Sequence, residues 1–115
     1  QAFGTDPVDS PKTPIVGSIT KLVLYDAKDD VIISAFDPLT SGAMVSTSDL
    51  GTTEFSIVAE VTGTVGSVAF SLDGTDPYRI ESVAPYALNG DNQQGNYGSW
   101  IPSIGSHTVS AIPYS

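Results

Sequence analysis

Hydrophobic and polar residues alternate at period two in several short segments of this chain. The pattern is clearest over residues 54–62, EFSIVAEVT, where every apolar position except Val58 falls on one face. The segment 65–72, VGSVAFSL, repeats the pattern and ends at Asp73-Gly74, a strong hairpin-turn signal. Alternation of this kind predicts strands with one buried face and one exposed face.

The remaining strand candidates are shorter and less regular. They are residues 18–25, 31–36, 43–45, 78–83 and 107–112. Residues 48–51 are expected to form a turn or a single helical turn, and Pro113 is expected to end the last strand. Because no window carries a 3.6-residue apolar stripe, the pattern predicts an all-β antiparallel sandwich of about seven short strands.

The first 16 residues differ in composition from the rest of the chain. Pro7, Pro11 and Pro14 each lack a backbone donor and favour extended backbone around them. We expect residues 1–16 to be an extended arm or linker, with a disordered tail as the alternative. The segment 17–115 is then one domain, and its length suffices for a single modest core.

Net charge and composition narrow the class of function. The chain carries 13 acidic and four basic residues, for a formal net charge of −9. Without a basic face it is not expected to bind nucleic acid or an anionic membrane surface. There is no cysteine, which excludes disulfides and thiolate zinc sites, and no apolar run reaches the ~18 residues of a membrane span.

The neutral part of the composition favours an extracellular location. Only 15% of residues are charged, and Ser, Thr, Gly and Asn occupy much of the remaining polar sequence. A hydroxyl-rich surface of this kind is common on extracellular β domains. Gln1 is therefore a candidate mature N-terminus, left after removal of a signal peptide.

Several segments together carry a resemblance to a known family. They are ITKLVLYDA (19–27), VGSVAFSLDG (65–74), YRIESVAPYALNGD (78–91), Tyr97, Trp100 and GSHTVSAIPYS (105–115). In this order they resemble an immunoglobulin-like module of secreted, multidomain bacterial surface proteins, found especially in Bacteroidota and often beside malectin-like domains. The resemblance implies a non-catalytic, extracellular, immunoglobulin-like β-sandwich, and it implies no particular ligand.

The same resemblance directs attention to the last strand. Modules of this kind continue past the Pro-Tyr-Ser segment into a final strand, whereas this sequence ends at Ser115. Either the chain is a fragment, or the sandwich is open at 106–112 and complemented there by another chain. We expect His107, Val109 and Ala111 to lie on this assembly edge, with the 1–16 arm of a neighbour as a candidate contact.

Residues 86–100 hold a group of candidate ligand-binding side chains. Aromatic rings can stack on a sugar while amides and carboxylates bind its hydroxyl groups. The candidates for such a site are Tyr86, Asp91, Asn92, Gln93, Tyr97 and Trp100. Because sandwich cores often bury a tryptophan, Trp100 is expected in the core, and Tyr97 is the preferred exposed ring. Tyr86, after Pro85, suits a corner of the sheet.

The same loop supplies oxygen atoms of the type that calcium prefers. Asn89, Asp91 and Asn96 are the candidate calcium ligands. Their spacing does not match an EF-hand loop. The alternative is ordinary turn chemistry, since Asn, Asp and Gly favour turns without any ligand.

Catalysis is not expected from this sequence. The one histidine, His107, falls in a predicted strand, and no Gly-x-Ser-x-Gly elbow accompanies it. We therefore expect a non-catalytic, extracellular structural or adhesive module that assembles with other copies of itself or with neighbouring surface proteins. The alternative is a carbohydrate-binding module that binds polysaccharide through loop 86–100.

Overall fold

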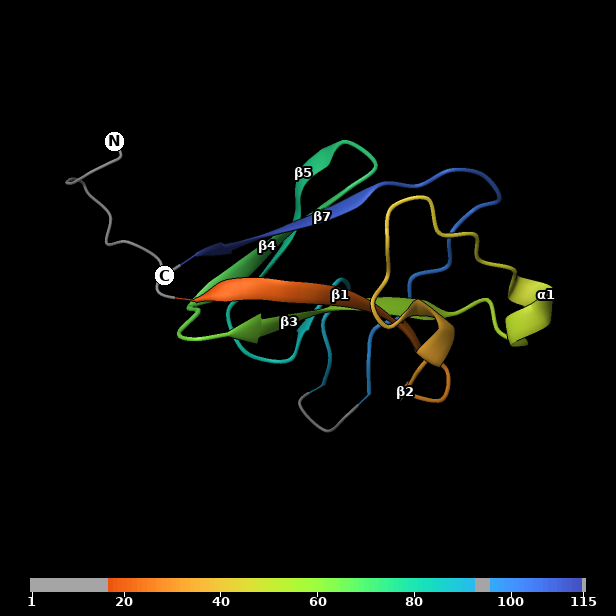
Figure 1. The fold of residues 1–115 in the computed structure, drawn as a ribbon, viewed down its shortest axis with the longest axis horizontal. Coiled ribbons are helices and arrows are strands. Elements are labelled where there is room, and N and C mark those ends of the chain that lie inside the picture. The colour runs from red at the N-terminus through yellow and green to blue at the C-terminus, as the bar shows by residue number, and fades with distance from the viewer. Residues whose placement is uncertain (1–16, 93–95, 115) are drawn as a thin grey trace.

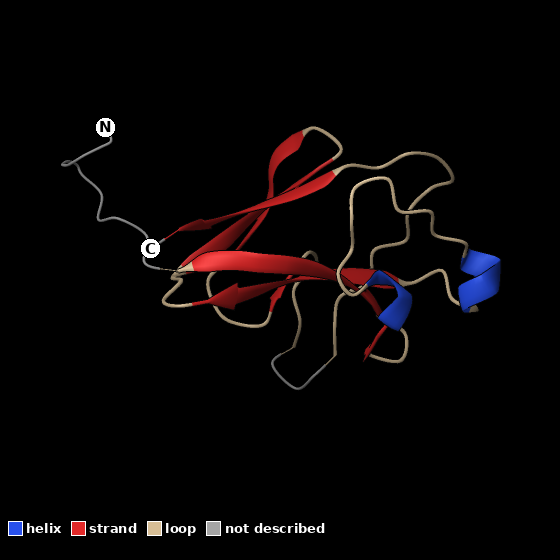
Figure 2. Ribbon diagram, viewed as in Figure 1, coloured by secondary structure: helices blue, strands red, loops and turns tan. Residues whose placement is uncertain are grey.

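The computed structural model describes residues 17–92 and 96–114, so the predicted arm at 1–16 lies outside the described residues. The elements are β1 (Ser18–Asp26), β2 (Val31–Ile32), η1 (Ser34–Phe36), α1 (Thr47–Leu50), β3 (Phe55–Thr62), β4 (Ser67–Leu72), β5 (Thr75–Glu81), β6 (Tyr86–Ala87) and β7 (Val109–Tyr114). The strands form two antiparallel sheets, β2-β1-β3-β6 and β5-β4-β7. Figures 1 and 2 show the two sheets as layers with α1 at one end. The all-β, two-sheet, sandwich-like prediction is confirmed.

The core lies between the two sheets. Strand β3 contributes Phe55, Ile57 and Ala59, and β4 contributes Val68 and Phe70 from the opposite layer. These residues occupy the faces that the alternating pattern assigns to the interior. Burying a side chain of this size contributes roughly 1.5–3 kcal/mol relative to leaving it in water, so the packing of β3 against β4 holds the layers together.

The outer face of the sheet that contains β1 and β3 is also buried over its middle. Val23 pairs with Val58 on this face, and Tyr25 pairs with Ser56. Val23, Val58 and Ser56 are all buried. The segment after β6 packs here, with the rings of Tyr25 and Tyr97 4.9 Å apart between centroids. Val58, the one exception in the alternating pattern, therefore has a buried position on the second face.

The region between β2 and β3 contains less strand than the sequence predicts. Only Val31 and Ile32 of the predicted 31–36 strand pair with β1, and η1 follows at once. Residues 43–45 form no strand. The predicted helical turn is confirmed as α1, where the Ser46 hydroxyl accepts the Asp49 N–H at 3.3 Å and caps the first turn.

Strand β5 begins at Thr75, directly after the Asp73-Gly74 turn, rather than at 78. It therefore includes Pro77, which falls where the register with β4 shifts. A bulge accommodates a proline because the ladder is already interrupted there. The short β6, which the sequence did not predict, continues the edge of β3 through the Val58–Ala87 pair.

The last strand was predicted to end at Pro113, and this prediction is wrong, because β7 runs through Pro113 to Tyr114. Val68 is the register partner of Pro113. Hydrogen-bonded and non-bonded pairs alternate along an antiparallel ladder. The Asp73 N–H donates to the Thr108 carbonyl at 2.8 Å, which fixes the alternation and makes Val68–Pro113 a non-bonded pair. The donor that proline lacks would therefore point away from β4.

No helix within residues 17–92 and 96–114 is long and apolar enough to cross a membrane. The helical elements, η1 and α1, are single short turns in the connection from β2 to β3. Figure 1 shows this connection running to the α1 end of the sandwich and back.

Replacing Ser56 with alanine should keep or raise the stability of the fold. The Ser56 hydroxyl is fully buried on the outer face of β3, and no described residue offers it a hydrogen-bond partner. Removing such a group recovers its desolvation cost, on the order of 1 kcal/mol. Thermal unfolding of Ser56→Ala should therefore show an equal or higher midpoint, with the exposed Ser110→Ala as the control. A clearly lower midpoint would show that the hydroxyl has a stabilising partner.

Candidate functional site

The outer edge of β7 is the candidate interaction site. Within the described residues β7 pairs with β4 alone and ends the order β5-β4-β7. Since Ser110, Ile112 and Tyr114 lie in the pairs that bond to β4, the backbone groups of the intervening residues point outward. This outer edge presents the N–H and C=O groups of Val109 and Ala111 and the C=O group of Pro113.

The other three sheet edges are less suited to receive a strand. Strands β2 and β6 have two residues each. Strand β5 carries Pro77, a register shift and three charged side chains. Short strands, bulges, prolines and charged side chains are features that disfavour edge-to-edge pairing of sheets. In contrast, β7 has six uncharged residues in unbroken register. Pro113 is the only one of these protective features that it has.

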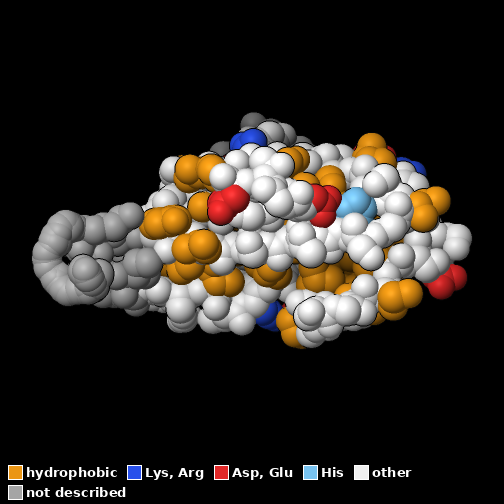
Figure 3. Space-filling view, turned by 90° about the horizontal axis from the view of Figure 1, so that it is seen from above, with side chains coloured by type: hydrophobic (Ala, Val, Ile, Leu, Met, Phe, Trp, Pro, Cys, Tyr) orange, Lys and Arg blue, Asp and Glu red, His pale blue; other side chains and the backbone are white. Residues whose placement is uncertain are grey.

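The side chains of β7 divide between the core and the outer face of the sheet. Val109 and Ala111 are half-buried and pack against the core cluster. On the outer face, Ile112 and Ile80 flank Ala69 as its register partners, and they are 47% and 58% exposed. Figure 3 shows hydrophobic side chains as separate patches on this side of the molecule. The outer face of this sheet therefore carries a short apolar row, Ile80, Ala69 and Ile112, that runs across the strands to β7.

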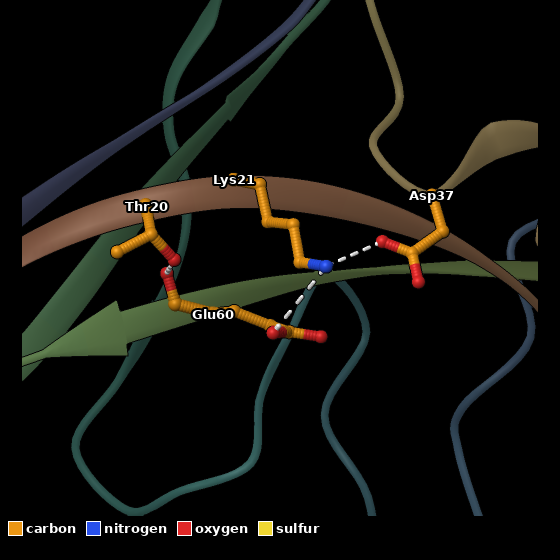
Figure 4. Close-up of polar contacts among 4 residues, drawn as sticks. All are labelled: Thr20, Lys21, Asp37 and Glu60. Atoms are coloured by element: carbon orange, nitrogen blue, oxygen red, sulfur yellow. Dashed lines mark hydrogen bonds and ion pairs between the residues drawn. The ribbon is translucent and has the colours of Figure 1, made fainter.

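The segment after η1 covers the edge of β1 beyond β2. The Lys21 ammonium lies 2.6 Å from the Asp37 carboxylate and 3.9 Å from that of Glu60, as Figure 4 shows. This hydrogen bond to Asp37 raises the pKa of Lys21. The Leu39 N–H donates to the Leu22 carbonyl at 2.7 Å. Side chains and backbone thus fix the segment along β1, which covers this edge, whereas no strand within residues 17–92 and 96–114 covers the outer edge of β7.

His107, predicted on the edge, lies just before β7. Its Nδ1 is 2.7 Å from the Asp73 carboxylate, and its Nε2 is 2.7 Å from the Ser103 carbonyl. The Thr108 N–H donates to the other Asp73 oxygen at 2.8 Å. The Trp100 ring meets the imidazole edge-on at 5.5 Å. This group joins the β4–β5 turn to the start of β7, a long-range contact that local sequence patterns do not reveal.

The predicted sugar-binding aromatic residues do not form one exposed platform. Tyr86 is buried, and its hydroxyl donates to the Val65 carbonyl at 3.0 Å. Tyr97 is half-buried against Tyr25, and burial is the main cause that raises the pKa of its hydroxyl. Trp100 is half-buried and pairs with Phe55 through its backbone. The structure gives each ring a packing partner in the domain.

The predicted polar ligands of this loop are joined by hydrogen bonds within the loop. The Asn89 amide accepts from the Tyr78 hydroxyl at 2.5 Å and donates to the Ser99 carbonyl at 2.8 Å. Asp91 pairs with Tyr97, and the Asn92 N–H donates to the Asn96 carbonyl at 3.1 Å. Gln93 lies outside the described residues. The segment is therefore a hairpin-like excursion that leaves the edge of β3 after Leu88 and returns to it at Trp100.

The candidate calcium ligands Asn89, Asp91 and Asn96 all fall in this excursion. The Asn89 side-chain oxygen already accepts a hydrogen bond. Among residues 17–92 and 96–114, no group of three or more His, Cys, Asp or Glu side chains is placed to hold a metal ion. Asp91 is the only one of the three candidates of these residue types, so calcium binding by Asn89, Asp91 and Asn96 stays a prediction beside the turn-chemistry alternative.

Comparisons with known proteins identify no relative. No family model matches the chain, and neither the curated proteins nor the solved structures contain a match. The assignment that the structure supports is thus a small all-β domain of two antiparallel sheets.

Replacing Gly90 with alanine should destabilise the domain more than replacing Gly74. Both residues have positive φ, +73° and +86°, so each substitution carries a backbone cost of about 1–2 kcal/mol. A Cβ at Gly90 would also lie 2.5 Å from an Arg79 nitrogen, whereas nothing lies near one at Gly74. The Arg79 guanidinium, at the end of a half-exposed side chain, would have to shift and loosen its pair with Glu81, so we expect up to about 1 kcal/mol of further loss. Equal losses in chemical denaturation would contradict the close Arg79 contact.

Tyr97→Ala should lower the stability of the isolated domain. The ring packs on Tyr25, and its backbone N–H donates to the Asp30 carboxylate at 2.9 Å. Loss of the ring should cost about 1–2 kcal/mol in urea denaturation. Ile104→Ala, at a fully exposed side chain, is the control and should leave the midpoint unchanged. An unchanged midpoint for Tyr97→Ala would instead favour an exposed, ligand-binding ring.

Proposed function

We propose that this domain is a non-catalytic, extracellular structural or adhesive module that assembles through strand or arm exchange at the outer edge of β7. The observation that carries the proposal is the position of β7 at the end of its sheet, with outward backbone groups at Val109, Ala111 and Pro113. Backbone groups of this kind pair readily with an added strand. The immunoglobulin-like resemblance of the sequence supports the same proposal.

The incoming segment would be extended and would alternate in polarity. Its backbone would meet two N–H groups and three C=O groups of β7, so the region from Val109 to Pro113 would set the length of the new ladder. Its inward side chains would continue the row of Val109 and Ala111 over the core, which favours apolar residues there. The uncharged β7 would not repel a second copy locally, although each chain has a net charge of −9.

The structure offers less support for the alternative functions. The rings of Tyr86 and Tyr97 have packing roles within the domain, which weakens the case for a carbohydrate platform. Both ring nitrogens of His107 contact acceptors in the fold, which leaves neither placed to act as a general base. We therefore favour assembly over sugar binding and over catalysis.

Ala111→Pro should abolish assembly without unfolding the domain. The Ala111 N–H points away from β4, so a proline there removes an outward donor and leaves the β4–β7 ladder intact, as at Pro113. Sedimentation velocity across a wide concentration range should show association of the wild-type chain and a monomeric variant. Higher salt should strengthen wild-type association, because it screens the negative charge of the two copies.

Ser110→Pro is the matched control for this experiment. Ser110 bonds to β4 through its backbone, so this variant should lose folding itself, seen by circular dichroism, whereas Ala111→Pro should keep the wild-type spectrum. A wild-type chain that stays monomeric at high concentration and high salt would refute assembly between copies.

A further inference from the structure

We propose that His107 is a proton-dependent clamp that holds the 100–108 segment and the start of β7 against the β4–β5 turn. The proposal does not depend on the proposed assembly function, because it concerns the local order of the domain itself. Its basis is the pair of acceptors that the fold places on the two sides of one imidazole ring: a carboxylate oxygen of Asp73 and the carbonyl oxygen of Ser103, each at 2.7 Å.

Both contacts are hydrogen bonds only when the ring carries two protons. A neutral imidazole has one N–H group, so it can donate to Asp73 or to Ser103 but not to both. The other nitrogen lone pair would then face an oxygen lone pair at 2.7 Å. The imidazolium donates from both nitrogens and also carries the charge that pairs with Asp73. This geometry therefore selects the protonated form of His107.

The clamp joins two segments that are far apart in the sequence, the β4–β5 turn and residues 103–108. Asp73 lies in the β4–β5 turn with a positive φ of 49°. It accepts from His107 with one oxygen and from the Thr108 N–H with the other, while its own N–H donates to the Thr108 carbonyl. Ser103 belongs to the connection from Trp100 to β7. Release of the ring would free this connection and the first residues of β7 together.

The surroundings of the ring contain one opposing charge and no competing cation among the described residues that contact it. Asp73 is the charged group that faces His107, and the Trp100 ring meets its edge. Asp76, on the same hairpin, accepts from the Ser71 hydroxyl at 2.9 Å and is engaged there. The response of the clamp to pH should therefore be set mainly by His107 and Asp73.

The signs of the two pKa shifts define the pH range of the clamp. The Ser103 carbonyl, followed by Asp73, raises the pKa of His107. The His107 hydrogen bond, followed by the Thr108 N–H, lowers the pKa of Asp73. The histidine contribution is complete below the ordinary pKa of about 6.5 and is lost as pH rises through the raised value. The aspartate contribution is complete above about 3.9 and is lost as pH falls through the lowered value.

An NMR titration of the full chain tests the clamp directly. His107 is the only histidine, so its ring signals can be assigned without ambiguity. We expect its midpoint above about 6.5. Exchange of the Asp73 and Thr108 amides, which are hydrogen-bonded in the clamp, should report an opening constant after correction for intrinsic rate. This constant should rise by up to ~tenfold per pH unit between the ordinary pKa of His107 and its raised value, and should be flat on either side until Asp73 titrates at low pH. A midpoint at or below the ordinary value, or opening that is independent of pH, would overturn the proposal.

Two variants separate the clamp from a merely structural role of the side chain. His107→Gln keeps one donor but cannot titrate, so exchange of the Asp73 and Thr108 amides should lose its pH dependence near neutral pH. Asp73→Asn keeps an acceptor for the Thr108 N–H but removes the charge, so the His107 midpoint should fall towards its ordinary value. If Asp73→Asn left the midpoint unchanged, Asp73 would have no part in the clamp. The wild-type titration decides the proposal even if a variant fails to fold.

Discussion

The second sheet of this domain depends on one strand, β4. It pairs with β5 on one side and with β7 on the other, and its inward residues Val68, Phe70 and Leu72 form one layer of the core. Neither β5 nor β7 has any other strand partner within the described residues. The fold of the second sheet therefore follows from how β4 packs on β3. Its two outer strands are held by backbone ladders to β4 and, for β7, by Val109 and Ala111 against the core.

The two edge strands of the second sheet, β5 and β7, differ in how well they could pair with a further strand. The β5 edge is interrupted by Pro77 and a register shift, and Arg79 and Glu81 pair with each other beside Gly90. The β7 edge has regular register, no charge and a single proline that faces outward. The first sheet is closed differently, by short terminal strands and by segments that cover the β1 edge and the outer face. Among the described residues, the β7 edge is thus the place that is least protected against an added strand.

The sequence predicts the parts of this structure that rest on local alternation and on turn chemistry. Strands β3 and β4, the Asp73-Gly74 turn and the helical turn at α1 are confirmed, because period-two alternation and Gly or Ser signals act over a few residues. The ends of β5 and β7 were wrong because a proline ends a strand only when its missing donor faces a partner strand. That orientation is a matter of register, which the sequence alone does not fix.

Some residues of the candidate sites could likewise be predicted from the sequence, and others could not. Val109 and Ala111 could be placed on an edge strand from alternation together with the family resemblance. The roles of Tyr86, Asn89 and Tyr97 could not, because each makes contacts with residues at least 11 positions away, such as Tyr86 with Val65. Composition alone had grouped these side chains as a ligand site, since amides, carboxylates and aromatic rings serve equally in sugar binding and in joining a loop to a sheet. The contact of His107 with Asp73 is likewise visible only in three dimensions.

Native-state amide hydrogen exchange along β7, in dilute monomeric protein, tests the open edge most directly. The amides of Ser110, Ile112 and Tyr114 donate towards β4, whereas those of Val109 and Ala111 point outward. We predict slow exchange for the first group and fast exchange for the second, with Val109 and Ala111 becoming slow only under conditions of assembly. Strong protection of Val109 and Ala111 in the isolated monomer would show that the β7 edge is already covered and would contradict its role as the site of assembly.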